Sequence, residues 1–146
     1  MYRNRLRLYL HLVWATWDRM PLIGQDMERD LYRFITGACL ELGCTPLAVN
    51  GMPDHVHTLL TFPATLCIAD IVERLKGSSS RFVNDKLRPD EFFKWQGHYG
   101  AFTVSAREKE KVRHYIENQK AHHAANTVWP SAEETLEPDP PESTRG

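Results

Sequence analysis

A turn-forming segment, Asn50-Gly51-Met52-Pro53-Asp54, is the feature that most constrains how this chain folds. Asn-Gly and Pro-Asp are typical of tight turns, because these residues adopt the backbone angles that reverse a chain. Short runs of strand-forming residues lie on both sides of it, over 45–50 and 56–62. We therefore predict that the two runs form a β-hairpin.

The rest of the chain supplies a series of elements around this hairpin. Hydrophobic periodicity predicts strands over 6–16 and 101–104 and helices over 26–42, 68–87 and 106–123. Ser105, with Glu108 three residues later, is a candidate cap for the last helix. The order strand, helix, strand, strand, helix, strand, helix predicts an α+β fold. We expect a ferredoxin-like antiparallel sheet with helices packed on it and an added C-terminal helix carrying Tyr115.

The chain divides into a body and a tail of different composition. Its 146 residues suit one domain with its own core. We predict a single domain over 1–126 and a disordered tail over 127–146, which is rich in proline and acidic residues. Residues from Val128 onward carry a formal charge of −4, so removing them from the net −1 leaves +3 on the body. A mildly basic body permits nucleic-acid binding.

The cysteines and the apolar runs indicate the cellular compartment of the protein. Three cysteines without a C-x-x-C pair indicate reduced thiols. His11 interrupts the first apolar run, which argues against a signal peptide, and no stretch has the length of a membrane span. We expect a cytoplasmic protein without a membrane partner.

Two histidines two residues apart, His55 and His57, lie in the second strand of the hairpin. Side chains alternate between the faces of a strand, so both imidazoles project from the same face and can reach one metal ion. The carbonyl oxygen of Gln119 would make a third ligand and leave positions open for water and substrate, as catalytic metal sites require. Nitrogen and oxygen ligands beside a phosphate suit Mg²⁺ or Mn²⁺.

Tyr115 lies four residues before Gln119 in the last predicted helix, one turn away on the same side. If this helix covers the histidine strand, a nucleophile and three metal ligands meet at one point. A phenol activated by a metal or a base can attack a phosphodiester and form a covalent phosphotyrosine. Taken singly, each motif has an ordinary explanation: half-exposed polar residues in a strand, and a packing tyrosine in an amphipathic helix.

Several motifs together resemble the HUH-type single-tyrosine transposases, small enzymes that move insertion sequences as single-stranded DNA, and their relatives, the REP-associated tyrosine transposases. The motifs occur in the family's order over about residues 5–123. They are His11-Leu12-Val13-Trp14, Met52-Pro53-Asp54-His55-Val56-His57, Leu75-Lys76-Gly77-Ser78-Ser79-Ser80, the segment 95–105 (WQGHYGAFTVS) and Tyr115-Ile116-Glu117-Asn118-Gln119. Relatives usually continue past the tyrosine helix with more folded sequence, where this chain has its acidic tail.

The resemblance implies roles for the matching residues. His55, His57 and Gln119 would be the ligands of a divalent metal, Mg²⁺ or Mn²⁺, and Tyr115 the nucleophile. The enzyme would recognise a DNA hairpin, then nick and rejoin single-stranded DNA at element ends through a 5′-phosphotyrosine. It would be a homodimer in which the tyrosine helix completes the partner's site. It would associate with the nucleoid when bound to DNA.

Contacts to DNA are harder to assign from the sequence. Lys76 and Arg81 flank the small residues of the second helix, where a phosphate could approach, and Arg5 and Arg7 alternate at the start of the chain. Trp95 offers an aromatic ring for stacking on unpaired bases.

Two alternatives to an active transposase stay open. One is a catalytically silent or domesticated relative that binds nucleic-acid hairpins without cutting. The other is a replication initiator or relaxase of plasmid type.

Overall fold

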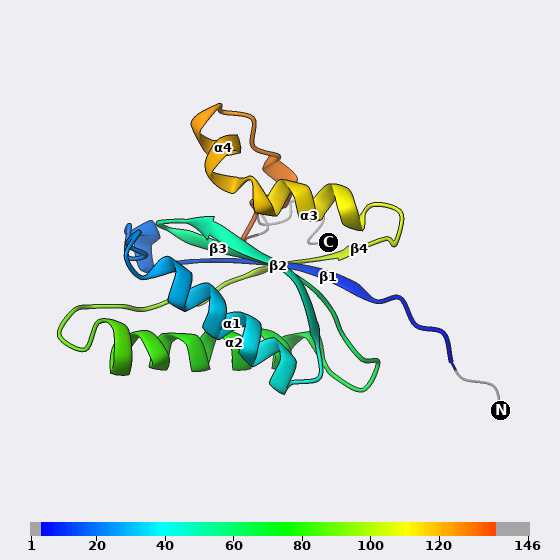
Figure 1. Ribbon diagram of the computed structural model, residues 1–146, viewed down its shortest axis with the longest axis horizontal. Helices are drawn as coiled ribbons and strands as arrows, with labels where there is room; N and C mark the ends of the chain where they lie inside the picture. The colour runs from blue at the N-terminus through cyan, green and yellow to red at the C-terminus, as the bar shows by residue number, and fades with distance from the viewer. Residues whose placement is uncertain (1–3, 137–146) are drawn as a thin grey trace, which may run out of the picture.

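A four-stranded antiparallel sheet forms the centre of the molecule (Figure 1). The computed structural model describes residues 4–136; predictions for 1–3 and 137–146 lie outside the described residues. The strands are β1 (Tyr9–Ala15), β2 (Thr45–Met52), β3 (His55–Thr61) and β4 (Gly100–Val104), in the order β2-β3-β1-β4. Helices pack on this sheet, so the predicted α+β fold is confirmed.

The hairpin of β2 and β3 is tighter than the sequence suggests. Met52 pairs with His55, so only Pro53 and Asp54 form the turn. Gly51 is required beside it, because a Cβ atom at this position would collide with the backbone carbonyl of His55. The short turn fixes the register of β3 and hence the face from which its histidines project.

Helices α1 (Glu28–Glu41) and α2 (Ile68–Phe82) cover one face of the sheet (Figure 1). The inward residues of β1 and β3 on this face are apolar and almost fully buried, and they form one cluster with the helices: Leu10, Leu12, Trp14, Val56 and Leu60. The helix predicted over 68–87 ends at Phe82 and continues as a π-helical turn, Val83–Leu87. This layer holds most of the apolar core.

The opposite face is covered by α3 (Lys109–Glu117) and α4 (Gln119–Ala124), where the sequence predicts one helix over 106–123 (Figure 1). That prediction is wrong at Asn118, whose φ of −106° and ψ of 27° interrupt the helix. The Asn50 side chain of β2 donates hydrogen bonds to the carbonyls of Ile116 and Glu117, 3.0 and 3.1 Å away. These bonds draw the last α3 carbonyls toward the sheet. Ser105 accepts a hydrogen bond from the Glu108 amide, 3.2 Å away, but it does so in a turn that precedes the helix: α3 begins at Lys109, so Ser105 is not its N-cap.

The segment that follows α4 differs from its prediction. Residues 127–136, expected to be part of a disordered tail, fold back against α3 and the sheet and include a 3₁₀ turn, Pro130–Ala132. Trp129 is the reason: its ring stacks on Tyr115 with centroids 4.1 Å apart and planes at 18°. An aromatic side chain in a polar segment thus brings that segment back to the domain.

In the described part of the chain, no helix has both the length and the apolar character that crossing a bilayer demands.

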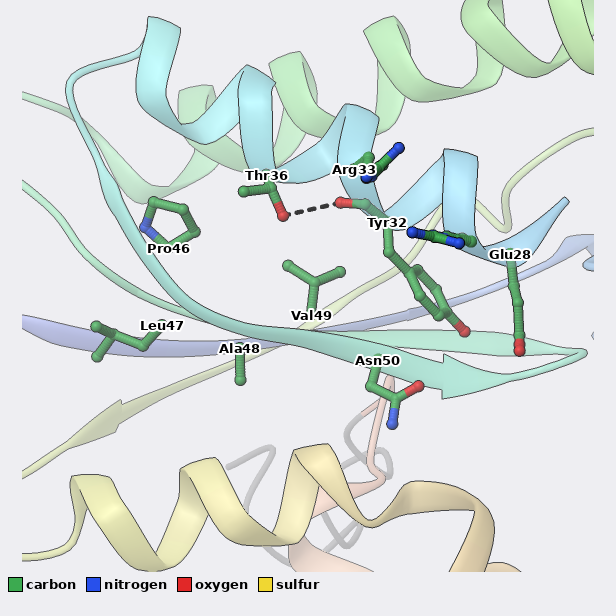
Figure 2. Close-up of a pocket in the computed structure, with 10 residues that line it drawn as sticks. Glu28, Tyr32, Arg33, Thr36, Pro46, Leu47, Ala48, Val49 and Asn50 are labelled. Carbon is green, nitrogen blue, oxygen red and sulfur yellow. Dashed lines mark hydrogen bonds between the residues drawn. The ribbon is translucent and has the colours of Figure 1, made fainter.

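A groove of about 480 Å³ lies between α1 and the edge strand β2 (Figure 2). Tyr32 and Thr36 line it from the helix and Val49 from the strand, whereas Ala48 and Asn50 point to the other side of the sheet. The groove is therefore separated from the histidines by β2, and we assign it no part in the chemistry below.

Candidate active site

The second face of the sheet carries a cluster of buried polar side chains. His55 and His57 project from this face of β3, as their spacing predicts, and His11 projects beside them from β1. These three imidazoles are at most 3% exposed. Such groups are costly to bury unless they are hydrogen-bonded, and each of the three has a partner.

Each histidine of the pair is held through its Nδ1 atom. His55 Nδ1 lies 2.7 Å from Asp54 Oδ1, and His57 Nδ1 lies 2.8 Å from His11 Nε2. Partners on one ring nitrogen fix the tautomer and the orientation of a ligand histidine. Both Nε2 atoms consequently point into a common space under α3 and α4.

The surroundings push the pKa values of these imidazoles in different directions. Burial lowers the pKa of His55, but hydrogen bonds with Asp54 and Glu133 outweigh it and raise the value to about 9. Burial lowers the pKa of His57, and it lowers that of His11 to about 3. At neutral pH His57 and His11 are therefore neutral, whereas His55 is protonated beside Glu133 and would have to release a proton to bind a metal ion.

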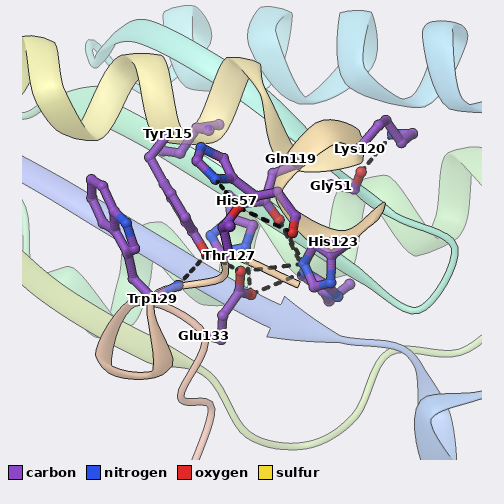
Figure 3. A network of polar contacts seen from close by, with 12 residues as sticks. Gly51, His57, Tyr115, Gln119, Lys120, His123, Thr127, Trp129 and Glu133 are labelled. Atoms are coloured by element: carbon purple, nitrogen blue, oxygen red, sulfur yellow. Dashed lines mark hydrogen bonds and ion pairs between the residues drawn. The ribbon is translucent and has the colours of Figure 1, made fainter. Parts of the chain in front are cut away.

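Helices α3 and α4 bring Tyr115 and Gln119 to the same place (Figure 3). The Tyr115 ring meets His57 edge-on, with centroids 6.1 Å apart. Gln119 Oε1 lies 3.3 Å from His55 Nε2 and 3.2 Å from His123 Nε2. The structure thus brings together all four residues that the sequence singles out, although the helix between Tyr115 and Gln119 is broken.

Glu133 is the site residue that sequence reasoning missed. Its Oε2 atom lies 2.8 Å from His57 Nε2 and 3.1 Å from His55 Nε2, while Oε1 accepts a hydrogen bond from the Tyr115 hydroxyl (Figure 3). Oε1 also lies 3.3 Å from His123 Nε2. An acid in an acidic tail gives no sign of such a role. The adjacent Trp129-Pro130 was the signal that could have found it, because an aromatic residue in a polar segment indicates packing.

The carboxylate and the phenol affect each other's ionisation. Burial opposes the charge on Glu133, but hydrogen bonds from His55, His57 and Tyr115 hold its pKa well below the ordinary value. Burial and the hydrogen bond to Glu133 raise the pKa of Tyr115 to about 12. In this arrangement Glu133 is ionised and Tyr115 keeps its proton at neutral pH.

The donor atoms fit a divalent metal. One ligand atom each from His55, His57 and Glu133 lie within 4.8 Å of one another. Gln119 adds an amide oxygen on the same side, and its Nε2 has no hydrogen-bond partner within the described residues. Two imidazoles with oxygen donors suit Mn²⁺, Zn²⁺ and related ions, and the set leaves room for a further oxygen ligand.

The residues predicted to contact DNA do not gather at this site. Trp95 cannot stack on bases, because it is 5% exposed, packs against Trp14 and donates a hydrogen bond to Ser79. Lys76 is half-buried and donates hydrogen bonds to the backbone carbonyls of Gln96 and His98, so it stabilises the loop before β4.

The three arginines of that prediction are exposed but distant from the histidines. Arg81 lies on α2, on the other face of the sheet. Arg5 and Arg7 precede the end of β1 that pairs with Thr61, away from His55. Their contacts with DNA stay predictions.

Comparison with solved structures defines the class of protein. A structure assigned as a transposase of Deinococcus radiodurans R1 superposes with a TM-score of 0.65 at 28% identity, over 82% of this chain and 98% of the other. The structure of the REP-associated tyrosine transposase bound to a REP hairpin shares the fold, with a TM-score of 0.60 at 14% identity, over 89% of this chain and 81% of the other. The fold is that of the transposases.

Sequence comparison identifies the family. The family model described as "Transposase IS200 like" matches residues 4–119. The ISDra2 transposase TnpA of Deinococcus radiodurans is 30% identical over 120 residues, which cover 77% of this chain and 84% of that protein. The chain belongs to the IS200-like transposase family, which confirms the resemblance seen in its motifs.

Proposed function

We propose that this protein is a metal-dependent transposase of single-stranded DNA that nicks and rejoins strands through a 5′-phosphotyrosine. The observation that carries the proposal is the convergence of the Tyr115 hydroxyl and the His57 Nε2 atom on one carboxylate, Glu133. A nucleophile and a histidine that reach the same small group are close enough for one phosphate to lie between the nucleophile and an ion that the histidine would hold. Membership of the transposase family supports the reaction class.

The chain's own residues divide the work. His55 and His57, with Gln119, would hold the divalent ion, Mg²⁺ or Mn²⁺, through Nε2 and Oε1 atoms that already face one another. When bound, the ion supplies electrostatic stabilisation of charge on the phosphate oxygens. Asp54 and His11 keep the two imidazoles in place during this step.

Tyr115 performs the covalent step. Its phenol oxygen forms a bond to the phosphorus while the bond from phosphorus to the 3′ oxygen breaks. The phenol loses its proton in this step, and the 3′ oxygen that leaves gains one to become a hydroxyl, so the number of protons does not change. The product is a 5′-phosphotyrosine on Tyr115, which retains the phosphoester bond for rejoining to another 3′ end.

The substrate follows from relatives rather than from this chain alone. A structural neighbour of the same fold is bound to a REP hairpin. We propose that this chain likewise recognises a single-stranded DNA hairpin and works as a homodimer in which the tyrosine helix completes the partner's site. Within one chain, Tyr115 already lies beside its own His57.

Covalent trapping tests the reaction. Protein, Mn²⁺ and labelled single strands from the DNA that flanks the gene are resolved on a denaturing gel. The wild type is expected to form an adduct, while Tyr115→Phe, His57→Ala and protein in EDTA form none. Tyr99→Phe is the matched control, since this tyrosine is 37% exposed and lies outside the site. An adduct with Tyr115→Phe would refute the assignment; tight binding without any adduct would favour a silent hairpin binder.

A further inference from the structure

We propose that residues 127–136 form a self-inhibitory strap, called the strap below, in which the Glu133 carboxylate occupies the place of the DNA phosphate. The inference rests on the proposed function, because it concerns access of DNA to the same site. In this closed form the enzyme is protected from reacting, and a single strand must displace the strap before Tyr115 can attack.

The first observation is the position of the anion. Glu133 lies between the Nε2 atoms of His55 and His57 and accepts the Tyr115 hydroxyl proton in a hydrogen bond. By the proposed function, the two imidazoles would hold the metal ion that a scissile phosphate contacts, and Tyr115 would attack that phosphate, so the carboxylate fills the space between the metal ligands and the nucleophile. Because two anions repel each other at such close range, the carboxylate and a phosphate cannot share this space. Glu133 and DNA therefore compete for one position.

The second observation is that the strap closes off the nucleophile. Tyr115 is only 1% exposed. The Trp129 ring stacks on its ring, and the Trp129 amide donates a hydrogen bond to its hydroxyl oxygen, 3.1 Å away (Figure 3). The hydroxyl thus donates to Glu133 and accepts from Trp129. The Trp129 ring and amide therefore cover this oxygen, and a DNA phosphate can reach it only after the strap moves.

The third observation is how the strap is attached. It begins after Asn126, whose φ of 55° is a left-handed conformation that few residues adopt, and its regular structure is one 3₁₀ turn. It crosses β4 at Gly100, where a Cβ atom would collide with the carbonyl oxygen of Glu134. A short segment with a hinge-like start, held mainly by Trp129 and Glu133, can leave without unfolding the sheet.

Charge favours exchange with DNA. The strap carries two acidic residues, Glu133 and Glu134, and no basic one, whereas the chain without its segment from Val128 onward has a net charge of +3. A nucleic-acid strand presents the same sign of charge at higher density. The strap thus imitates, within the chain, the kind of molecule that we expect to replace it.

Chemical accessibility of Tyr115 tests the strap without requiring catalysis. Full-length protein is treated with tetranitromethane, and nitration of each tyrosine is followed by mass spectrometry, with exposed Tyr99 as the internal reference. We expect Glu133→Gln and Trp129→Ala to raise the nitration rate of Tyr115 several-fold. Glu134→Gln is the matched control. It removes the same charge, but Glu134 is exposed and lies outside the polar network. Equal Tyr115 nitration in all four proteins would overturn the proposal.

DNA affinity provides the second test. Anisotropy of a labelled single strand from the flanking DNA is measured in EDTA, so that no adduct forms. We expect Glu133→Gln to bind about tenfold more tightly than Glu134→Gln, since only the former opens the site. Equal affinities of the two variants would contradict the strap. So would a Glu133→Gln protein that loses Mn²⁺ affinity while Tyr115 stays unreactive, because Glu133 would then be a working ligand.

The two proposals fail separately. If no protein forms an adduct with Mn²⁺, yet Glu133→Gln exposes Tyr115 and tightens DNA binding, the transposase chemistry fails and the strap stands. If the wild type forms an adduct at the rate of Glu133→Gln and Tyr115 nitration is unchanged, the strap fails and the chemistry stands.

Discussion

The two faces of the sheet differ in whether they bury polar side chains: the first is apolar, and the second combines a smaller apolar cluster with buried polar groups. The face under α1 and α2 is an apolar layer in which residues such as Leu12 and Leu60 are fully buried. The face under α3 and α4 buries His57, Gln119 and Tyr115; His57 and Tyr115 both contact Glu133, and Gln119 contacts His55. Buried apolar side chains gain stability by leaving water, whereas buried polar groups are costly unless they are hydrogen-bonded.

The comparison separates stability from chemistry. Removing methyl groups from the apolar face leaves a cavity, whereas removing a polar group from the other face leaves a partner unsatisfied. We therefore expect truncation of apolar residues, which fill the first face, to act on the free energy of unfolding, and substitution of the polar residues of the second face to act mainly on metal and DNA binding. The four predictions below test this division.

The largest effect on stability is expected from Leu60→Ala. Leu60 is 0% exposed at the centre of the apolar cluster, so the change should lower the free energy of unfolding by about 2–5 kcal/mol. Urea denaturation measures it. Leu40→Ala is the control, since that side chain is 60% exposed on α1 and should cost less than about 1 kcal/mol. A Leu60→Ala protein that stays folded but loses Mn²⁺ affinity would break the division between the faces.

The sequence predicted the apolar face better than the polar one, and the reason is physical. Periodicity reports which side of a helix or strand is buried, so the strands, α1 and α2 follow from local pattern. The histidine pair followed in the same way from the alternation of β3. The break at Asn118 did not, because it depends on Asn50, which is distant in sequence. Glu133 was missed because its position depends on Trp129 packing, which composition conceals.

On the polar face, the next largest effect is expected from Asp54→Asn. Asp54 holds His55 through Nδ1 at 2.7 Å, and loss of its charge should weaken Mn²⁺ binding by about 10–100-fold. The free energy of unfolding should change less, because the Asp54 side chain is 36% exposed. Isothermal titration with Mn²⁺ measures the affinity. Asp85→Asn, an exposed acid beyond α2, serves as control; an equal loss in both variants would show a general charge effect.

The pH dependence of stability in EDTA sharpens the contrast. The pKa of His55 is raised from 6.5 to about 9. Its contribution to the free energy of unfolding is therefore complete below pH 6.5 and is lost as the pH rises through 9. The pKa of His11 is lowered from 6.5 to about 3, so stability also declines as the pH falls below 6.5.

We therefore expect a maximum of thermal stability near pH 6.5, with losses of about 1–2 kcal/mol on the alkaline side. Calorimetry in EDTA measures it. Glu133→Gln removes one of the groups that raise the pKa of His55, so it should reduce the loss of thermal stability above pH 6.5. Glu134→Gln should leave that loss unchanged. A wild-type profile that keeps rising from pH 6.5 to 9 would contradict the assignment of His55.

The smallest effect is expected on the outer surface of α3, the helix that carries Tyr115 inward. Arg113 forms an ion pair with Glu117 at 3.1 Å, and both side chains are more than two-fifths exposed, 43% and 47%. Because water screens such a pair, Arg113→Ala should lower the free energy of unfolding by no more than about 0.5 kcal/mol. Ile116→Ala on the inner side of α3, where the side chain is 0% exposed, should cost about 2–5 kcal/mol. Urea denaturation of the two variants would therefore show whether α3 is held by the residues that pack beneath it; similar values would mean that its surface charges hold Tyr115 in place.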